Sequence, residues 1–231
     1  MLKTRLDRSD VYASAWLKGL TTDAINDLQA ITEFMEYENK DTIYAIGGPQ
    51  QWIWGICSGC VKVLVAMAKM DPVVGHIHHP RAWFGESEPL LGIDGLVEMK
   101  AIGQTTVARV PYTKFKECAD GKPELWEAYA RLCSMNQLLA VAAANDLALV
   151  RSEKRIAATL LRLSGQRSVL QGSEASDIVH ANQQEVATLA NISLSKASGH
   201  LNKMAREGFI DLRYGHISIL DPRGLQTVIG D

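Results

Sequence analysis

The sequence predicts an α+β fold in three parts: a β-sandwich or barrel, one long helix and a C-terminal winged helix-turn-helix. Short strands separated by glycines between residues 41 and 110 predict the β part. Residues 124–150 contain no glycine or proline and are rich in alanine, which favours a helix. Helix caps and a tight turn between residues 182 and 220 predict the last part. We therefore expect domains at 1–122, 123–150 and 151–231.

Length and composition are those of a folded protein. Of its 231 residues, 47% are hydrophobic and 22% are charged, so the chain can bury a core without cross-links. The longest apolar run, residues 138–144, is far shorter than the roughly 20 residues that span a bilayer. The first eight residues show no apolar signal region. We expect a cytoplasmic protein with no membrane partner.

Four cysteines are present, at positions 57, 60, 118 and 133, and they need not form disulfides in such a compartment. Cys57 and Cys60 have the spacing of a redox or metal pair. No second pair of this spacing and no βαβ pattern accompanies them. Strand and turn positions are therefore the main interpretation, and a redox or metal role is the alternative.

The β part begins after a short helix. Thr22 or Asp23 is expected to cap this helix, and Ile25, Leu28 and Ile31 mark its apolar face. Residues 52–54, 61–65 and 105–110 read as strands because β-branched and aromatic residues alternate with glycine-containing turns.

The long helix predicts a homodimer. Pro123 suits its first turn, and about 27 residues would extend about 40 Å, more than a small domain needs. Such a helix usually packs along a partner, so we expect dimerisation through residues 124–150. A core helix laid on the β part is the alternative. The apolar stripe, which Asn136 and Asp146 interrupt, consists of Leu125, Tyr129, Leu132, Leu139, Ala143 and Val150.

The C-terminal part carries the clearest local signals. Ser152 is expected to cap a first helix that Gly165 ends. Asn182 and Glu185 form a capping box for the next helix, which stops at Asn191. Ser193 then caps a further helix that stops at Gly208. Residues 209–213 and 216–220 alternate like a hairpin around a Tyr-Gly turn, which is the wing of a winged helix.

The helix after Ser193 has the spacing of a recognition helix. Ala197, Leu201 and Met204 lie at i, i+4 and i+7 and form its buried stripe. The opposite face would enter a major groove, where hydroxyl and amide groups read bases and cations bind phosphate. Protein contact is the alternative use of this face. The candidate DNA-binding residues, including flanking and wing positions, are Ser193, Ser195, Lys196, Gly199, Asn202, Lys203, Arg206 and Arg213.

Net charge differs between the two ends of the chain. The whole chain carries -2, which argues against a nucleic-acid partner. Residues 1–150 hold 14 basic and 18 acidic side chains, whereas residues 151–231 hold 10 basic and 8 acidic ones. The mildly basic end is the predicted winged helix, so salt-sensitive attraction to phosphate is expected there.

Several motifs, in this order and spacing, resemble the Crp–Fnr family of transcription regulators. They are residues 16–21, the strand-Gly-strand turn at 56–63, the Trp-Phe-Gly-Glu stretch at 83–86, the helix at 155–161 and the unit at 184–210. The resemblance covers about residues 16–228. It implies an N-terminal β-roll like a cyclic-nucleotide-binding jelly roll, a dimerisation helix and a DNA-binding winged helix. The implied partners are a pseudo-palindromic operator in double-stranded DNA and RNA polymerase.

The chain departs from that family in its effector site. Members that bind cyclic AMP carry an Arg-Ser pair after the glutamate motif, and here those positions are Gly95 and Leu96. A buried phosphate would lose its counter-charge, so an effector other than cyclic AMP is expected. A regulator without effector is the alternative. The pocket candidates are Gly85, Glu86, Ser87, Gly95, Leu96, Ala140 and Val141.

Two further family features differ. No cysteine precedes Cys57, so an N-terminal iron–sulfur cluster is not expected, and neither is any other cofactor. The family's usual base-reading residues are an Arg-Glu pair and a later Arg. Here Leu194, Ser195 and Gly199 occupy these positions, so the operator should differ from the family's common half-site.

A histidine cluster suggests the enzyme alternative. His76 and His78 would share one face of a strand, and with Glu86 they could form a cupin-like metal site. The gap of eight residues from His78 to Glu86 is too long for a cupin motif, and the next histidine after His79 is His180. We therefore expect exposed polar histidines beside a turn, no metal and no enzymatic activity.

Overall fold

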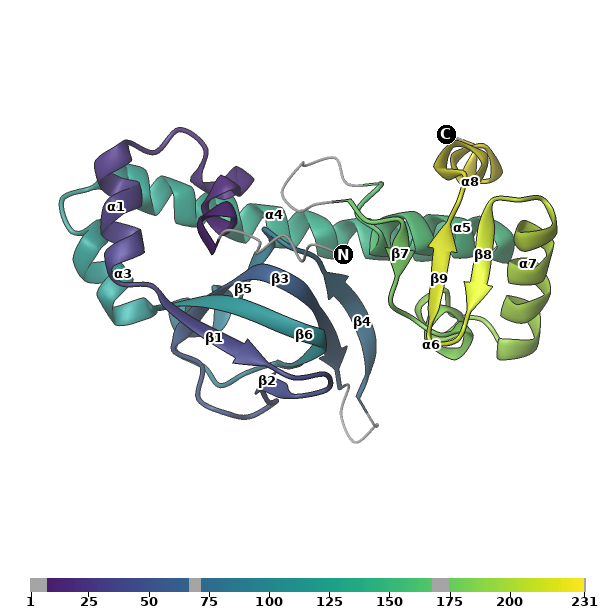
Figure 1. Cartoon of the computed structure of the whole chain (residues 1–231), viewed down its shortest axis with the longest axis horizontal. Helices are drawn as coiled ribbons and strands as arrows, with labels where there is room; N and C mark the ends of the chain where they lie inside the picture. The colour runs from purple at the N-terminus through teal and green to yellow at the C-terminus, as the bar shows by residue number, and fades with distance from the viewer. Residues whose placement is uncertain (1–7, 67–71, 168–174, 231) are drawn as a thin grey trace, which may run out of the picture. The chain divides into compact units, whose positions relative to one another are not determined.

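The computed structural model describes residues 8–66, 72–167 and 175–230, and it confirms the α+β fold with a β-roll, a long helix and a winged helix-turn-helix (Figure 1). The chain divides into two compact units. The first contains most residues before Leu138 and the second most residues from Leu138 on. The division therefore falls inside the long helix α4, Pro123–Ala148, and the expected three domains stay a prediction.

In the first unit, β1, β6 and β3 are neighbours in one sheet, in which β2 also pairs with β6 and β5 with β3, whereas most of β4, residues 73–77, is grouped with the second unit. Both faces of β3 are buried, because Ile53 and Cys57 point to one core cluster and Trp54 and Ile56 to another. The strands are β1 Glu33–Tyr37, β2 Thr42–Tyr44, β3 Trp52–Val65, β4 Val73–His78, β5 Trp83–Phe84 and β6 Val97–Pro111.

The strands at 52–54 and 61–65 are parts of one strand, β3, and the turn expected between Cys57 and Cys60 is wrong. The chain instead makes a bulge, with register shifts against β6 on both sides of Ser58. Gly59 has φ +78°, and a Cβ there would lie 2.6 Å from the Gln104 carbonyl oxygen. Only glycine fits this backbone, so the glycine that signalled a turn marks a bulge.

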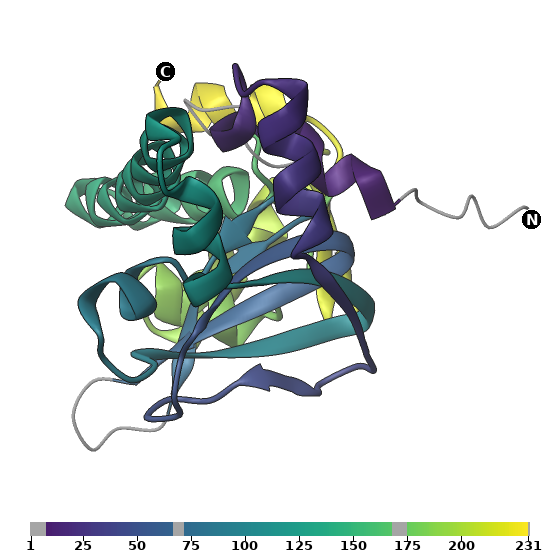
Figure 2. The ribbon, with the colours of Figure 1, turned by 90° about the vertical axis from the view of Figure 1, so that its left-hand side faces the viewer.

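Helices cover one face of this sheet (Figures 1 and 2). Thr21 caps α1, accepting a hydrogen bond from Ala24 N, so the cap lies one residue before the expected Thr22 or Asp23. Leu28 of α1, Phe115 of α3 and Leu132 of α4 are buried in one core cluster. The helices before α4 are η1 Arg8–Ala13, η2 Ala15–Leu17, α1 Thr22–Ala30, α2 Ser87–Leu91 and α3 Tyr112–Ala119.

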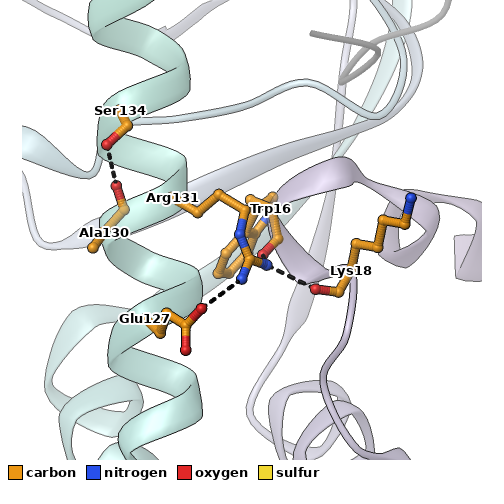
Figure 3. Close-up of polar contacts among 6 residues, drawn as sticks. All are labelled: Trp16, Lys18, Glu127, Ala130, Arg131 and Ser134. Atoms are coloured by element: carbon orange, nitrogen blue, oxygen red, sulfur yellow. Dashed lines mark hydrogen bonds and ion pairs between the residues drawn. The ribbon is translucent and has the colours of Figure 1, made fainter.

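Arg131 fixes the first half of α4 to the N-terminal segment (Figure 3). Its guanidinium donates to the carbonyl oxygens of Trp16 and Lys18, at 2.9 and 2.7 Å, and to the Glu127 carboxylate at 3.2 Å. A planar guanidinium suits such convergent acceptors. The first half of α4 is therefore anchored by polar contacts as well as by its apolar face.

The second unit is built from α4's C-terminal half, helices and a three-stranded sheet with the order β7-β9-β8. Ser152 does not cap α5: Arg151 is the N-cap residue and makes no side-chain cap bond. The Ser152 hydroxyl is 2.8 Å from His200 Nε2 instead. The remaining elements are α5 Ser152–Leu163, β7 Ile178–Val179, α6 Gln183–Leu189, α7 Leu194–Arg206, β8 Ile210–Arg213, β9 His216–Ile219 and α8 Pro222–Ile229.

The expected apolar stripe along the long helix is not continuous. Leu125, Tyr129 and Leu132 are buried in the first unit's own core. Beyond Gln137, Leu139 and Ala143 of the expected stripe are only half-buried, and Val150 is exposed and lies past the helix end. Among the helices in the described ranges, none combines the length and the hydropathy that a membrane span requires.

Candidate nucleic-acid interface

The helix-turn-helix is held by its caps. Asn182 Oδ1 accepts from Glu185 N at 3.0 Å, and Glu185 Oε2 accepts from Asn182 N at 2.9 Å, which confirms the capping box. Asn191 adopts a left-handed φ of 50° after α6. Ser193 Oγ then accepts from Lys196 N and caps α7. These local contacts set the turn between α6 and α7.

One side of α7 is buried and the opposite side is open. Ala197, Leu201 and Met204 are each 0% exposed, as the spacing predicted. The structure places every candidate DNA-binding residue at the surface, and seven of them share α7 and its N-cap. These exposed residues are Ser193, Ser195, Lys196, Gly199, Asn202, Lys203 and Arg206 on the helix, and Arg213 on the wing strand β8.

Acidic side chains offset part of the positive charge on this surface. Lys203 Nζ donates to Glu153 at 2.8 Å and lies 3.8 Å from Glu207. The hydrogen bond to Glu153, and then the charges of Glu153 and Glu207, raise the pKa of Lys203. Arg213 pairs with Asp211 at 2.7 Å. Lys196 and Arg206 make no ion pair with the residues the structure describes, so they carry the unbalanced charge.

The wing adds one residue that the sequence reasoning treated only as a turn. Tyr214 lies between β8 and β9 and is fully exposed. The hairpin register, with Arg213 opposite His216, is the one expected for a Tyr-Gly turn. A tyrosine in a tight turn of the wing is the sequence signal that could have identified it, because tyrosines are enriched at interfaces.

The pocket candidates around Glu86 are engaged within the first unit. Glu86 is 4% exposed, its carbonyl oxygen accepts from the Tyr129 hydroxyl at 2.5 Å, and Ser87 Oγ lies 3.4 Å from its carboxylate. Burial raises the pKa of Glu86, and a hydrogen bond with Asn136 opposes that effect. Gly85 has φ +79°, and a Cβ there would lie 2.8 Å from Trp54. Sequence reasoning did not identify Tyr129 and Asn136 as partners of this glutamate.

None of the remaining pocket candidates has a positively charged side chain. Gly95 N donates to Gly48 O at 2.9 Å, and a Cβ on Gly95 would lie 2.9 Å from Ala45 O. The backbone of residues 45–48 thus occupies the space beside Gly95. Leu96 is exposed, and its N–H donates to the buried Glu88 carboxylate at 3.4 Å. Ala140 and Val141 are exposed on α4 in the second unit.

The expectation of exposed histidines is wrong. His78 and His79 are buried, and His76 is half-buried. His78 stacks on Phe84 with ring centroids 5.2 Å apart, and burial followed by the charge of His79 lowers its pKa to about 4. Within the described residues, no three histidines, cysteines or carboxylates are grouped to hold a metal.

The cysteines of the Cys57–Cys60 bulge are free thiols. Cys60 Sγ lies 3.6 Å from His79 Nδ1. Burial raises the pKa of both thiols to about 11, although hydrogen bonding to Ala108 opposes it at Cys57. Because the thiolate is the reactive form, this environment favours a packing role over redox chemistry.

A β-roll joined by a long helix to a winged helix-turn-helix with an open recognition face defines a class of two-part DNA-binding transcription regulators. Residues 154–228 match the model of the Crp-like helix-turn-helix domain. The C-terminal part of the chain is therefore a Crp-like helix-turn-helix domain, and the chain as a whole is similar to transcription regulators. This agrees with the resemblance that the motifs predicted.

Two relatives and one solved structure document the similarity. Transcriptional regulatory protein btr of Bordetella pertussis is 24% identical, over 92% of this chain and 88% of the relative. Transcriptional regulator SdrP of Thermus thermophilus is 25% identical, over 86% of this chain and 95% of the relative. The structure of FixK2 from Bradyrhizobium japonicum is 16% identical, covers 86% of this chain and 97% of its own, and has a TM-score of 0.70.

Proposed function

We propose that this chain is a cytoplasmic, homodimeric transcription regulator that binds a pseudo-palindromic operator through α7 and the wing. The single observation that carries the proposal is the open face of α7 opposite a fully buried stripe. Ser195 and Asn202 would read base edges, while Lys196, Lys203, Arg206 and Arg213 would bind phosphate or guanine. Gly199 would permit close approach. RNA polymerase is a further partner of such a regulator.

The dimer interface is proposed for α4 from Ser134 onward. Exposed residues recur there at spacings of three and four, as in a two-stranded coiled coil: Ser134, Leu138, Val141, Asn145 and Ala148. Leu138 and Val141 are 51% and 55% exposed. Two copies joined along this seam would present their recognition helices about 34 Å apart, one turn of DNA. Sedimentation velocity of the wild type and of Val141→Asp tests the seam.

The β-roll is proposed as the regulatory domain, 1–122, with 123–150 as the dimerisation helix and 151–231 as the DNA-binding domain. A shift in population between two orientations of the DNA-binding domain would connect effector and operator. Gly95 and Leu96 support an effector other than cyclic AMP, because neither provides a counter-charge for phosphate. The same observation favours a second candidate, a regulator without effector.

Selection of bound DNA from random sequence tests the proposal. The wild type should enrich a palindromic consensus with two half-sites about one helical turn apart. Lys196→Glu should lose this enrichment, whereas Lys114→Glu, the same exposed charge change on α3, should keep it. Enrichment of no consensus by the wild type would contradict the proposal. Thermal-shift screening with nucleotides, metals and metabolites then separates the two candidates, since a bound effector stabilises the fold.

A further inference from the structure

The joint between α4 and α5 contains a buried ion pair, Asp146–Arg162, and neither residue is among the candidate DNA-binding residues. We infer that Asp146 and Arg162 are positioning residues: their ion pair fixes α5 against α4 and so sets the spacing of operator half-sites that the dimer accepts. This inference rests on the proposed function. It concerns contacts within the second unit only, from Leu138 onward.

Both carboxylate oxygens of Asp146 are used. Oδ2 accepts from Arg162 Nε at 2.8 Å, and Oδ1 accepts from Arg167 Nη1. The Asp146 and Arg162 side chains are only 2% and 6% exposed. Asp146 lies near the end of α4 and Arg162 in the last turn of α5. The pair therefore joins the two helices at one defined point.

This ion pair is expected to add little to the free energy of unfolding. Burying two charges costs much of what their attraction returns, and apolar residues of similar size often stabilise such a site more. Arg162 Nη1 is buried without a hydrogen-bond partner in the described structure, which adds to the cost. Its neighbours in α5, Leu161 and Leu163, are fully buried, so the site could have been apolar throughout. A fixed geometry is what the pair supplies.

A second polar contact fixes the other end of α5. Arg155 Nη1 donates to Leu149 O at 2.8 Å, at the end of α4, and Arg155 Nε donates to Ala190 O at 2.8 Å, at the end of α6. With Asp146–Arg162 at the last turn, two separated points define the direction of α5 relative to α4. Arg155 also contacts the end of α6, so the direction of α5 determines where the helix-turn-helix lies relative to α4.

The recognition helix itself is tied to the start of α5. The Ser152 hydroxyl is 2.8 Å from His200 Nε2, and Glu153 accepts from Lys203 Nζ at 2.8 Å. A rotation of α5 about the joint would therefore move α7. In a dimer joined along α4, the angle between α4 and α5 determines the separation of the two α7 helices, and hence the half-site spacing that both can occupy.

The test replaces the pair by apolar residues, in Asp146→Leu/Arg162→Met. Such a replacement is expected to preserve folding, which thermal unfolding checks. Binding is measured to the selected operator and to operators whose half-sites are moved by up to about five base pairs, half a helical turn. The matched control is Glu36→Leu/Arg8→Met, which removes an exposed ion pair of the first unit.

The wild type and the control should bind the half-turn-shifted operators at least about tenfold more weakly than the selected one. The double variant should bind all spacings within about threefold, with unchanged affinity for a single half-site. Arg162→Lys keeps the charge without the Nε geometry and should relax the spacing partly; it carries the test if the double variant melts early.

The possible failures are distinguishable. A double variant that retains the wild-type spacing profile overturns the positioning role and leaves the proposed function intact. A wild type without palindromic binding or spacing preference overturns the proposed function and this inference with it. Loss of single half-site affinity in the double variant also overturns the positioning role, because the pair would then support the recognition surface itself.

Discussion

The two units use their polar side chains in opposite ways. In the first unit, Glu86, His78 and His79 are buried and make contacts with their own fold. In the second unit, the polar candidates on α7 are exposed, and only part of their charge is balanced within the chain. The first arrangement stabilises one structure, whereas the second keeps hydrogen-bonding groups available for another molecule.

The long helix α4 shows the same contrast along its length. In its first half, an apolar face is buried and Arg131 binds two backbone carbonyls. In its second half, Leu138 and Val141 are exposed, and only Asp146 is fully buried. One helix thus anchors the first unit with apolar contacts and positions the second with a charge. Substitutions in the two units test this contrast, and the largest effect is expected at the buried His78.

Buried His78 should make the stability of the first unit depend on pH. Its pKa in the folded state is about 4, against an ordinary value of 6.5, because burial disfavours the charged ring. Between pH 6.5 and 4 the unfolded chain therefore takes up a proton that the folded chain does not. Stability should fall by about 3 kcal/mol as pH drops through this window, with the contribution fully present above pH 6.5.

Tryptophan fluorescence measures this effect selectively, because all five tryptophans lie in the first unit. Urea unfolding between pH 7 and 4 should show a steep loss of stability in the wild type and a shallower one in His78→Gln. His216→Gln, at a half-buried histidine of β9 in the second unit, should behave like the wild type. Identical pH profiles for His78→Gln and wild type would show that the buried ring does not exclude protons.

One substitution at two glycines should give opposite signs in the two units. A Cβ on Gly95 would lie 2.9 Å from Ala45 O, so Gly95→Ala should destabilise the first unit by about 1–3 kcal/mol. Gly199 lies in α7, and a Cβ there would have no other side chain or distant backbone within 4 Å. Gly199→Ala should therefore stabilise its helix by about 0.5–1 kcal/mol.

Tryptophan fluorescence measures the first effect, and hydrogen exchange of the α7 amides measures the second. Operator binding by Gly199→Ala adds a functional readout, because a methyl group on the open face should weaken close approach to DNA while the fold gains stability. Equal destabilisation by both substitutions would break the contrast between a filled and an open site.

The helix-turn-helix was predictable because its signals are local. Asn182, Glu185 and Ser193 define caps within four residues, and the stripe through Ala197 depends only on helical geometry. The first unit depends on contacts distant in sequence, and there local reasoning failed. Gly59 was expected in a turn and lies in a bulge set by β6, and His79 was expected in solvent and lies 3.6 Å from Cys60.

Asp146 illustrates why the joint between α4 and α5 was also missed. In a helical pattern, a charged residue in an apolar stripe reads as an interruption of the stripe. Its role becomes visible only with Arg162, which lies 16 residues away on the next helix. Asn136 is the same case in the first unit, since it donates to Trp83 O at 3.1 Å. Both side chains were predicted only to interrupt the apolar stripe, and both form hydrogen bonds within the chain.

Asn202→Ala tests whether the open face of α7 reads bases. A side-chain amide in the major groove discriminates by hydrogen bonds to base edges, so its loss should relax preference at one base pair per half-site by about tenfold. Affinity for unrelated DNA should stay unchanged. The measurement is selection from random sequence, with Asn26→Ala, at an exposed position of α1, as the matched control. Ser195→Ala should relax a different base pair, and an unchanged consensus in both variants would favour protein contact.

Lys203→Ala tests the smallest term, the phosphate contacts at the edge of the same face. Lys203 shares its charge with Glu153 and Glu207, so its loss should weaken binding only by about two- to fivefold, and by a similar factor on every sequence. The slope of affinity against salt concentration should decrease by about one, because one phosphate contact is lost.

Lys18→Ala, at an exposed lysine of the first unit, should change neither the affinity nor its salt dependence. Glu153→Gln removes the competing carboxylate and should strengthen binding to all DNA. A sequence-dependent effect of Lys203→Ala would instead place this side chain among the base-reading residues. If Lys203→Ala had no effect on binding, Lys203 would not contact the DNA phosphates, and the proposed orientation of α7 in the groove would be wrong.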